Sequence, residues 1–334
     1  MTDTNSYIEA LTTLEVSGWS IPAALTLPAT ASRDDVLPSA ILLVPGSLFS
    51  DVNGDYPTWN SFPHVYAHLA RQLSAKGHAV YRFAKLGPGT GSTSTDQELS
   101  AKVRNWEGRL TIAMAALDAM RRGLESRGIR TTRTIAAGHS EGSVVVSRLA
   151  VSEAGHALDG VILLSGPSIG ILGIMREQID LHVAPNEREE ARRKHDEAVR
   201  HIHRGERIPV ELATGTGMGI SALANMPPEA LSYMRDVDLT DPLALAREVP
   251  QPTLVVQGGK DDSVPRHHGE HLRDALRSRS GGEANTGYVF VPEVTHMYKI
   301  VPPEVVGPAA FGFPGPVDAR VVDAIDGWIR HLAS

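Results

Sequence analysis

Short runs of apolar residues alternate along the chain with longer segments in which apolar residues recur every three or four positions. The run from Ala40 to Val44 is apolar throughout, which is typical of a strand buried on both faces of a parallel sheet. The segment from Val65 to Ala75 instead places Val65, Leu69 and Leu73 on one helical face. Because parallel neighbouring strands are joined by crossovers that are usually helical, this alternation predicts an α/β fold with a mostly parallel sheet flanked by helices.

The same alternation continues to the end of the chain. Further strands are expected at residues 78–83, 132–137, 160–164, 253–257 and 288–291. Further helices are expected at residues 101–125, 142–151, 267–276 and 317–332. Near the start, residues 12–16 and 21–27 flank Gly18 and predict two antiparallel strands at one edge of the sheet.

One long segment interrupts this alternation. From residue 171 to residue 248 the pattern is helical without a strand signal, and residues 187–197 alternate in charge at helical spacing, which is typical of a solvated helix. We therefore predict that residues 1–170 and 249–334 form the core domain and that residues 171–248 form a helical cap inserted into it.

Composition narrows the class of protein. Hydrophobic residues make up 42% of the 334 residues and charged residues 21%, which is ordinary for a folded domain. The formal net charge of −7 gives no electrostatic reason to expect a nucleic-acid partner. The chain has no cysteine, which excludes disulfides and thiolate chemistry and fits a reducing compartment. Because no signal peptide or long apolar stretch is visible, we expect a cytoplasmic protein without a membrane partner.

The strongest chemical signal is the sequence Gly138-His139-Ser140-Glu141-Gly142. It follows a predicted strand and precedes a predicted helix, which is the context of a nucleophile elbow. A sharp turn of this kind leaves little room for Cβ atoms beside the serine, so glycines flank it. The alternative is an ordinary serine that caps a helix.

A serine nucleophile needs a base and a group that orients the base, and both are expected later in the chain. Asp261 follows the predicted strand 253–257, at the edge of the sheet where open α/β folds bind ligands. His296 follows the next strand and can act as a general base and then as a general acid. Asp262 competes with Asp261, and either could be a solvated turn residue. The alternative for His296 is a histidine without a catalytic role, as most of the fourteen histidines must be. We expect the serine hydroxyl, the imidazole and the carboxylate to touch one another.

The oxyanion of an acyl-transfer reaction also needs hydrogen-bond donors. The backbone N–H of Glu141, directly after the serine, is one candidate. The loop that begins at Gly46 leaves a strand at the same edge of the sheet, so the N–H of Ser47 is expected as the second donor, with Leu48 as the substitute. The alternative is a simple tight turn.

Taken together, these motifs resemble the α/β-hydrolase superfamily, and within it the serine aminopeptidase-like branch of intracellular acyl esterases. The resemblance covers nearly the whole chain and is most specific at residues 138–142, 259–265 and 292–296. The chain departs from many relatives at Pro45, where they have His, and at Ala84, where they have Asp. The resemblance implies an α/β-hydrolase fold and favours Asp261 over Asp262 as the acid.

Other features receive weaker interpretations. The glycines of residues 87–92 lack the spacing of a phosphate-binding loop. His267 and His271 stand one helical turn apart and could bind a metal, but no third ligand is evident, so no metal is expected. Apolar residues of the cap could line an acyl pocket or form the core of the cap itself; those expected to contact substrate, with Leu48, are Met175, Met218 and Met226.

The sequence therefore predicts a serine hydrolase that cleaves an ester of a small molecule through an acyl-enzyme, without a cofactor. The same residues could serve a peptidase, a thioesterase, a lactonase or a carbon–carbon bond hydrolase, because the fold does not fix the substrate. A noncatalytic binding protein of the same fold is the alternative from another class. A homodimer stays open.

Overall fold

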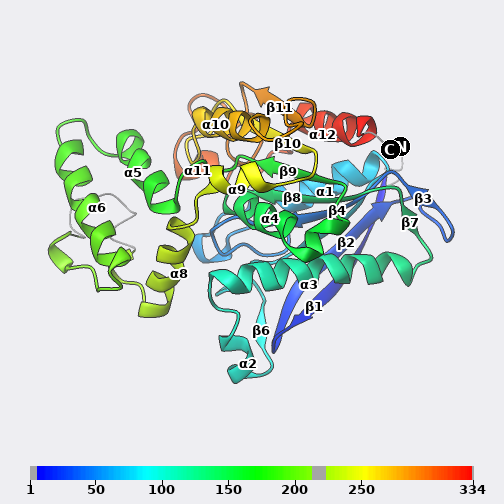
Figure 1. The fold of residues 1–334 in the computed structure, drawn as a ribbon, viewed down its shortest axis with the longest axis horizontal. Helices are drawn as coiled ribbons and strands as arrows, with labels where there is room; N and C mark the ends of the chain where they lie inside the picture. Colours follow the sequence, from blue (N-terminus) through cyan, green and yellow to red (C-terminus); the bar gives the residue numbers. More distant parts are fainter. Residues whose placement is uncertain (1–5, 213–222, 333–334) are drawn as a thin grey trace.

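The computed structural model describes residues 6–212 and 223–332 of the chain (Figure 1). Its centre is a nine-stranded sheet in the order β1-β2-β5-β4-β8-β9-β10-β11, with β6 paired to β2. The strands are β1 (Tyr7–Val16), β2 (Trp19–Pro28), β4 (Ala40–Val44), β5 (Ala79–Phe83), β6 (Thr93–Ser94), β8 (Thr134–His139), β9 (Gly160–Leu164), β10 (Thr253–Gly258) and β11 (Thr286–Val291). Two short strands, β3 (Val36–Leu37) and β7 (Arg130–Thr131), pair separately.

The sheet is antiparallel at one edge and parallel elsewhere. β1 pairs with β2 and β2 with β5 in antiparallel register, while the neighbours from β5 to β11 are parallel. The parallel strands β4, β5, β8, β9 and β10 are almost entirely buried, as continuous apolar runs predict. The α/β prediction, with an antiparallel edge near the start of the chain, is confirmed.

Helices cover both faces of the sheet. On one face α3 (Trp106–Glu125), α4 (Glu141–Val151) and α10 (Arg266–Arg277) contribute Met120, Val145 and Leu272 to a single apolar cluster with the strands. On the other face α1 (Val65–Ala75) and α12 (Ala319–His331) contribute Leu69 and Ile325 to a second cluster. The carboxyl ends of the parallel strands are therefore left open between two helical layers, and loops from them can meet there.

The segment predicted as a cap contains helices and no strand among its described residues. Its elements are α5 (Ile171–His182), α6 (Arg188–His203), the 3-10 turn η3 (Val210–Leu212), α8 (Pro228–Asp238) and α9 (Pro242–Glu248). Figure 1 shows α5 and α6 at one side of the sheet, at left, with α8 between them and the sheet. Leu172, Ile202 and Leu231 pack in an apolar cluster of their own, whereas Ala246 of α9 packs in the cluster that lies on the sheet.

Most predicted helices differ from the observed ones by one or two residues at their ends, and one predicted helix is divided. Residues 101–125 form the end of α2 (Gln97–Ala101) and the separate α3, instead of one helix. The break follows from capping: the side chain of Asn105 accepts a hydrogen bond from Gly108 N–H, so a new helix begins at Trp106. The remaining short elements are η1 (Pro57–Trp59), η2 (Glu153–Ala157) and α11 (Pro308–Phe311). None of the described helices has the length and apolar character needed to cross a membrane.

Candidate active site

Ser140 forms the turn between β8 and α4. Its backbone has φ 55° and ψ −125°, a conformation that side chains with a Cβ rarely adopt and that costs about 1–3 kcal/mol. Its N–H donates to the carbonyl of Leu164, at the end of β9, over 2.8 Å. The turn is therefore held in a strained geometry by the sheet next to it, and Ser140 itself stays partly exposed.

The glycines on either side of Ser140 are required by close backbone contacts. A Cβ on Gly138 would lie 2.1 Å from the carbonyl oxygen of Gly142. A Cβ on Gly142 would lie 2.4 Å from the carbonyl oxygen of Val44 and 2.8 Å from that of Pro45. All three distances are shorter than real Cβ contacts. Glycine is therefore required at both positions because α4 packs closely against β8 and against the end of β4, which precedes the loop at residues 45–48.

Asp261 and His296 follow neighbouring strands and lie in direct contact. Asp261 comes after β10 and His296 after β11, and Nδ1 of His296 lies 3.0 Å and 2.9 Å from the two carboxylate oxygens. Both residues are buried, at 7% and 5% exposure. Because the carboxylate can only accept, Nδ1–H is the donor in this contact, and Nε2, the other ring nitrogen, takes no part in it.

Further donors hold the Asp261 carboxylate. The backbone N–H groups of Ser263 and Val264 donate to Oδ1 over 3.0 Å and 2.8 Å. Burial alone would raise the pKa of Asp261, but His296 and the N–H of Val264 lower it below its usual value, so the group is ionised. Asp262 is only partly buried and makes no hydrogen bond with His296, both being described residues.

The expected contact between Ser140 and His296 is not formed. Among the described residues, Ser140 Oγ makes no hydrogen bond, either with His296 or with another group. Of the two hydrogen bonds expected among Ser140, His296 and Asp261, the one between His296 and Asp261 is therefore formed and the one between Ser140 and His296 is not.

The loop at residues 45–48 lies against the serine. A Cβ on Gly46 would be 3.1 Å from Ser140 Cβ and 3.7 Å from its Oγ. The N–H of Gly46 donates to the hydroxyl of Tyr66 over 2.9 Å, so it is not available to a ligand. The N–H groups of Ser47 and Leu48 have no partner among the described residues, which leaves the two predicted donors of this loop free.

A cluster of three buried charged side chains and one tyrosine lies behind the turn at Ser140 and the loop at residues 45–48. Its members are Lys85, Arg109, Glu141 and the partly buried Tyr233. Glu141 Oε1 lies 3.0 Å from Lys85 Nζ and 3.3 Å from Arg109 Nε. The hydroxyl of Tyr233, from α8, donates to the same oxygen over 2.7 Å. Burial would raise the pKa of Glu141, but Lys85 and Arg109 lower it, and burial lowers the pKa of Lys85 to about 8 although Glu141 opposes this.

The two cations of this cluster also hold the loop at residues 45–48. Arg109 donates to the carbonyls of Pro45, over 2.6 Å, and Gly46, over 3.4 Å. Lys85 donates to the carbonyl of Ser47. Because its carbonyls are fixed by groups anchored on Glu141, the loop is tied to the residue that follows Ser140.

A second buried chain of hydrogen bonds connects this loop with His296. His139 Nε2 donates to the carbonyl of His296 over 3.0 Å, and Tyr66 donates from its hydroxyl to His139 Nδ1 over 3.1 Å. These directions follow because burial, and then His296, lower the pKa of His139 to about 3, so its ring is neutral. Tyr66 therefore accepts from Gly46 while it donates to His139.

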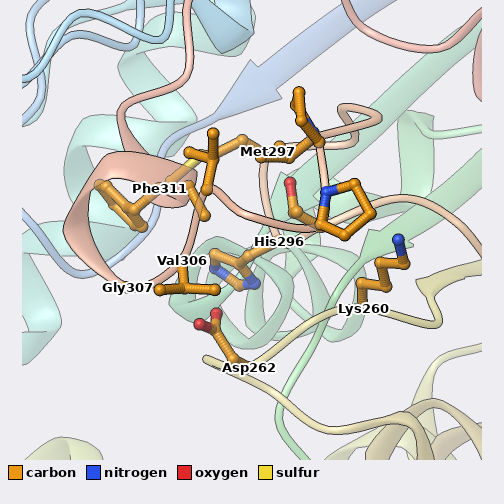
Figure 2. A pocket seen from close by; sticks show the side chains of 13 residues that line it. Lys260, Asp262, His296, Met297, Val306, Gly307 and Phe311 are labelled. Carbon is orange, nitrogen blue, oxygen red and sulfur yellow. The ribbon is translucent and has the colours of Figure 1, made fainter.

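A pocket of about 350 Å³ opens beside His296 (Figure 2). It is lined mainly by apolar side chains from the segment after β11 and by two charged residues from the loop after β10. The lining comprises Lys260, Asp262, Thr295, His296, Met297, Val301, Pro302, Pro303, Val305, Val306, Gly307, Ala310 and Phe311. Figure 2 shows Val306, Gly307 and Phe311 on one side of His296 and Lys260 on the other.

None of the described residues predicted to bind substrate lines this pocket. Met175 and Met226 pack against the apolar cluster inside the predicted cap, which was the alternative interpretation of these side chains. Leu48 is partly buried and packs against the α1 and α12 face of the sheet. Met218 lies outside the described residues.

The sequence interpretation missed Lys85, Arg109, Tyr233, Tyr66 and His139. For Arg109 the sequence holds a signal, namely a charged residue on the apolar face of a helix. It stands three, four and seven residues before Ile112, Ala113 and Ala116, which are buried on the same helix. Lys85 follows the buried strand β5 at the edge where ligands bind. For Tyr233 no local pattern exists, because its partner Glu141 lies 92 residues away.

Comparisons with known proteins agree with this architecture. A model of the Alpha/beta hydrolase family matches residues 41–306 of the chain. A search of curated proteins finds no match to the sequence.

Several solved structures share the fold at low sequence identity. Est1E from Butyrivibrio proteoclasticus is 15% identical, with a TM-score of 0.53 over 96% of this chain and 97% of its own. Carboxyl esterase 2 from the mycorrhizal fungus Tuber melanosporum is 13% identical, with a TM-score of 0.54 over 100% of this chain and 89% of its own. The acylaminoacyl peptidase of Pyrococcus horikoshii is 11% identical, with a TM-score of 0.55 over 98% of this chain and 42% of its own.

Proposed function

Because this chain belongs to the alpha/beta hydrolase family, we propose that it is a serine hydrolase that cleaves carboxylic esters, with Ser140 as nucleophile, His296 as base and Asp261 as the orienting acid. The observation that carries the proposal is the buried Asp261–His296 pair, which leaves Nε2 of the imidazole free at the sheet edge that also presents Ser140 on its strained turn. A free imidazole nitrogen and a partly exposed hydroxyl are the two groups that acyl transfer requires.

The reaction proceeds in two halves. Nε2 of His296 takes the proton of Ser140 as Oγ forms a bond to the ester carbonyl carbon, and the carbonyl oxygen becomes an oxyanion bound by the N–H groups of Ser47 and Glu141. Collapse breaks the bond to the alkoxide, which takes the proton from His296. Water then repeats these steps on the acyl-enzyme and releases the acid. The Ser140–His296 hydrogen bond forms when substrate binds, since such bonds often tighten only in the complex.

The pocket beside His296 supports a small substrate with an apolar group. Its volume of about 350 Å³ is near the lower end of the range for small-molecule sites. Esters are preferred over other acyl compounds because carboxyl esterase 2 from Tuber melanosporum, which shares the fold, is named as an esterase. We expect p-nitrophenyl esters with short acyl chains to be hydrolysed faster than those with long chains.

The nucleophile is tested by comparing the wild-type protein with Ser140→Ala. We expect the variant to lose p-nitrophenyl butyrate hydrolysis by about a thousandfold or more while its circular dichroism is unchanged. A fluorophosphonate probe should label the wild type on Ser140, as located by peptide mass spectrometry, and should not label the variant. Unchanged turnover in the folded variant would refute the proposal, and an unlabelled, inactive wild type would favour a noncatalytic binding protein.

The acid is tested with two adjacent aspartates as a matched pair. Asp261→Asn should lower kcat by about a thousandfold or more, because the amide no longer holds Nδ1–H of His296 in the required orientation. Asp262→Asn should leave kcat nearly unchanged, since Asp262 makes no hydrogen bond with the imidazole, both being described residues. The reverse order of the two rates would transfer the role to Asp262. Aminoacyl amides, thioesters and lactones, assayed beside the esters, test the other substrate classes.

A further inference from the structure

Three side chains of the kind that bind metal ions meet between α5 and α10. Glu177 comes from α5, and His267 and His268 come from the start of α10. Nε2 of His268 lies 2.9 Å from Glu177 Oε2, and Nε2 of His267 lies 3.2 Å from the same oxygen. The three ligand atoms all lie within 4.8 Å of one another. Ligand atoms around a tetrahedral zinc ion, at bonds of about 2.0–2.1 Å, are about 3.3 Å apart, so the cluster needs only small shifts to surround an ion.

The second nitrogen of His268 is held by Ser168. Nδ1 lies 2.7 Å from Ser168 Oγ and accepts a hydrogen bond from the backbone N–H of Ser168 over 3.2 Å, and the ring is fully buried. Because Nδ1 accepts from an N–H, the ring proton lies on Nε2 and is donated to Glu177 when no ion is bound. An ion at Nε2 would shift this proton to Nδ1, where Ser168 Oγ can accept it, as the partners of metal-binding histidines do. The buried ring of His268 is thus aimed at Glu177.

The cluster is open to solvent on the side of His267 and Glu177. The side chains of His267 and Glu177 are 43% and 35% exposed, so an ion can enter from solvent and keep water as a further ligand. Two imidazoles and one carboxylate suit zinc and similar transition metals. Magnesium and calcium prefer oxygen ligands throughout, so these donors disfavour them.

We infer that Glu177, His267 and His268 form a binding site for a divalent transition metal, with zinc as the principal candidate. The ion would join the predicted cap to the core, since α5 and α10 lie on the two sides. It would also act close to the loop that carries Asp261: Gln178, next to Glu177, donates to the carbonyl of Ser263 over 3.0 Å. The role is structural, because no ligand belongs to the Ser140–His296–Asp261 set.

The test uses untagged full-length protein freed of metal with a chelator that is then dialysed away. Titration with zinc chloride in a calorimeter should show one ion bound per chain. A zinc concentration of about a hundredfold over Kd should raise Tm by about 5 °C, and magnesium or calcium should leave Tm unchanged. A chain that binds no zinc, or binds it without thermal stabilisation, overturns the inference.

Matched variants separate a metal site from a simple hydrogen-bonded link. Glu177→Gln keeps an oxygen that can accept from the histidines, so Tm without zinc should hardly change, while zinc affinity should fall by at least about tenfold. His267→Ala removes a partly exposed ligand and should weaken binding similarly. His331→Ala removes an exposed histidine on α12 and should bind zinc like the wild type. Wild-type affinity in both Glu177→Gln and His267→Ala would show that zinc binds elsewhere and would overturn the assignment.

Discussion

Replacing Glu141 with Gln tests whether the buried cluster behind the turn stabilises the fold. Gln has nearly the same shape and still offers an oxygen to the hydroxyl of Tyr233. The substitution removes the negative charge that lies within 3.0 Å of Lys85 and 3.3 Å of Arg109. It therefore leaves two cations in the interior without their anion.

The magnitude follows from the burial of the three groups. Their side chains are 5%, 6% and 2% exposed for Lys85, Arg109 and Glu141, so water cannot replace the missing partner. Removing one partner of a buried ion pair costs about 3–5 kcal/mol of unfolding free energy. Lys85 can reduce this cost by losing its proton, because its pKa is already about 8, whereas an arginine guanidinium stays charged. A loss near the lower end, about 3 kcal/mol, is expected.

Urea unfolding followed by tryptophan fluorescence measures the effect. With a denaturant dependence of about 3 kcal/mol per M, the midpoint should fall by about 1 M. Glu190→Gln is the control, because Glu190 and its partner Arg193 are 56% and 61% exposed, and water screens an exposed pair of this kind so that its loss should hardly change the midpoint. If Glu141→Gln unfolds at the same urea concentration as Glu190→Gln, the cluster does not hold the fold and the reasoning fails.

Three further predictions follow from the same region. Burial lowers the pKa of Lys85 from 10.5 to about 8, so between pH 8 and 10.5 the unfolded chain holds more protons than the folded chain, and the free energy of unfolding should rise with pH. Lys85→Met should remove up to about 1.4 kcal/mol per pH unit of that rise, as measured by urea titrations at pH 8, 9 and 10. Gly142→Ala should destabilise the fold by about 1–3 kcal/mol and reduce hydrolysis, because the added Cβ would lie 2.4 Å from a backbone oxygen. Gly327→Ala is the control: nothing lies near its Cβ, so it should be neutral or stabilising in the same assays. Tyr66→Phe leaves a buried N–H and an imidazole nitrogen unpaired and should cost about 1–3 kcal/mol in urea unfolding; an unchanged midpoint would contradict the assigned hydrogen bonds.

The sequence predicts most accurately those elements that have one local cause. Strand Ala40–Val44 and helix Val65–Ala75 have the predicted bounds because a fully buried strand is apolar throughout and a surface helix has one apolar stripe. The break between α2 and α3 is not visible in the apolar pattern, which continues across it, and it is marked only by Asn105, the cap at which α3 begins. The order of strands also explains why Asp261 and His296, after successive strands, come into contact.

The remaining parts of the site depend on contacts between distant segments. No local pattern in the sequence connects Glu177 with His267, because the two stand 90 residues apart on different helices. The same holds for the hydroxyl of Tyr233, which reaches Glu141 from α8. The pocket beside His296 lies mainly along residues 295–311, where the sequence is rich in proline and glycine and shows no periodic pattern that could predict it. Periodicity reports which face of an element is buried, but not which other element covers it.

The positive φ of Ser140 makes the most important position of the proposed mechanism a poor choice for folding. Glycine suits that backbone better than any other residue, so Ser140→Gly should relax the turn and yield a protein that is harder to unfold and has no nucleophile. Selection for robustness alone would therefore remove this serine. A serine at so unfavourable a backbone position is expected where selection for an activity, and not for stability, determines the residue.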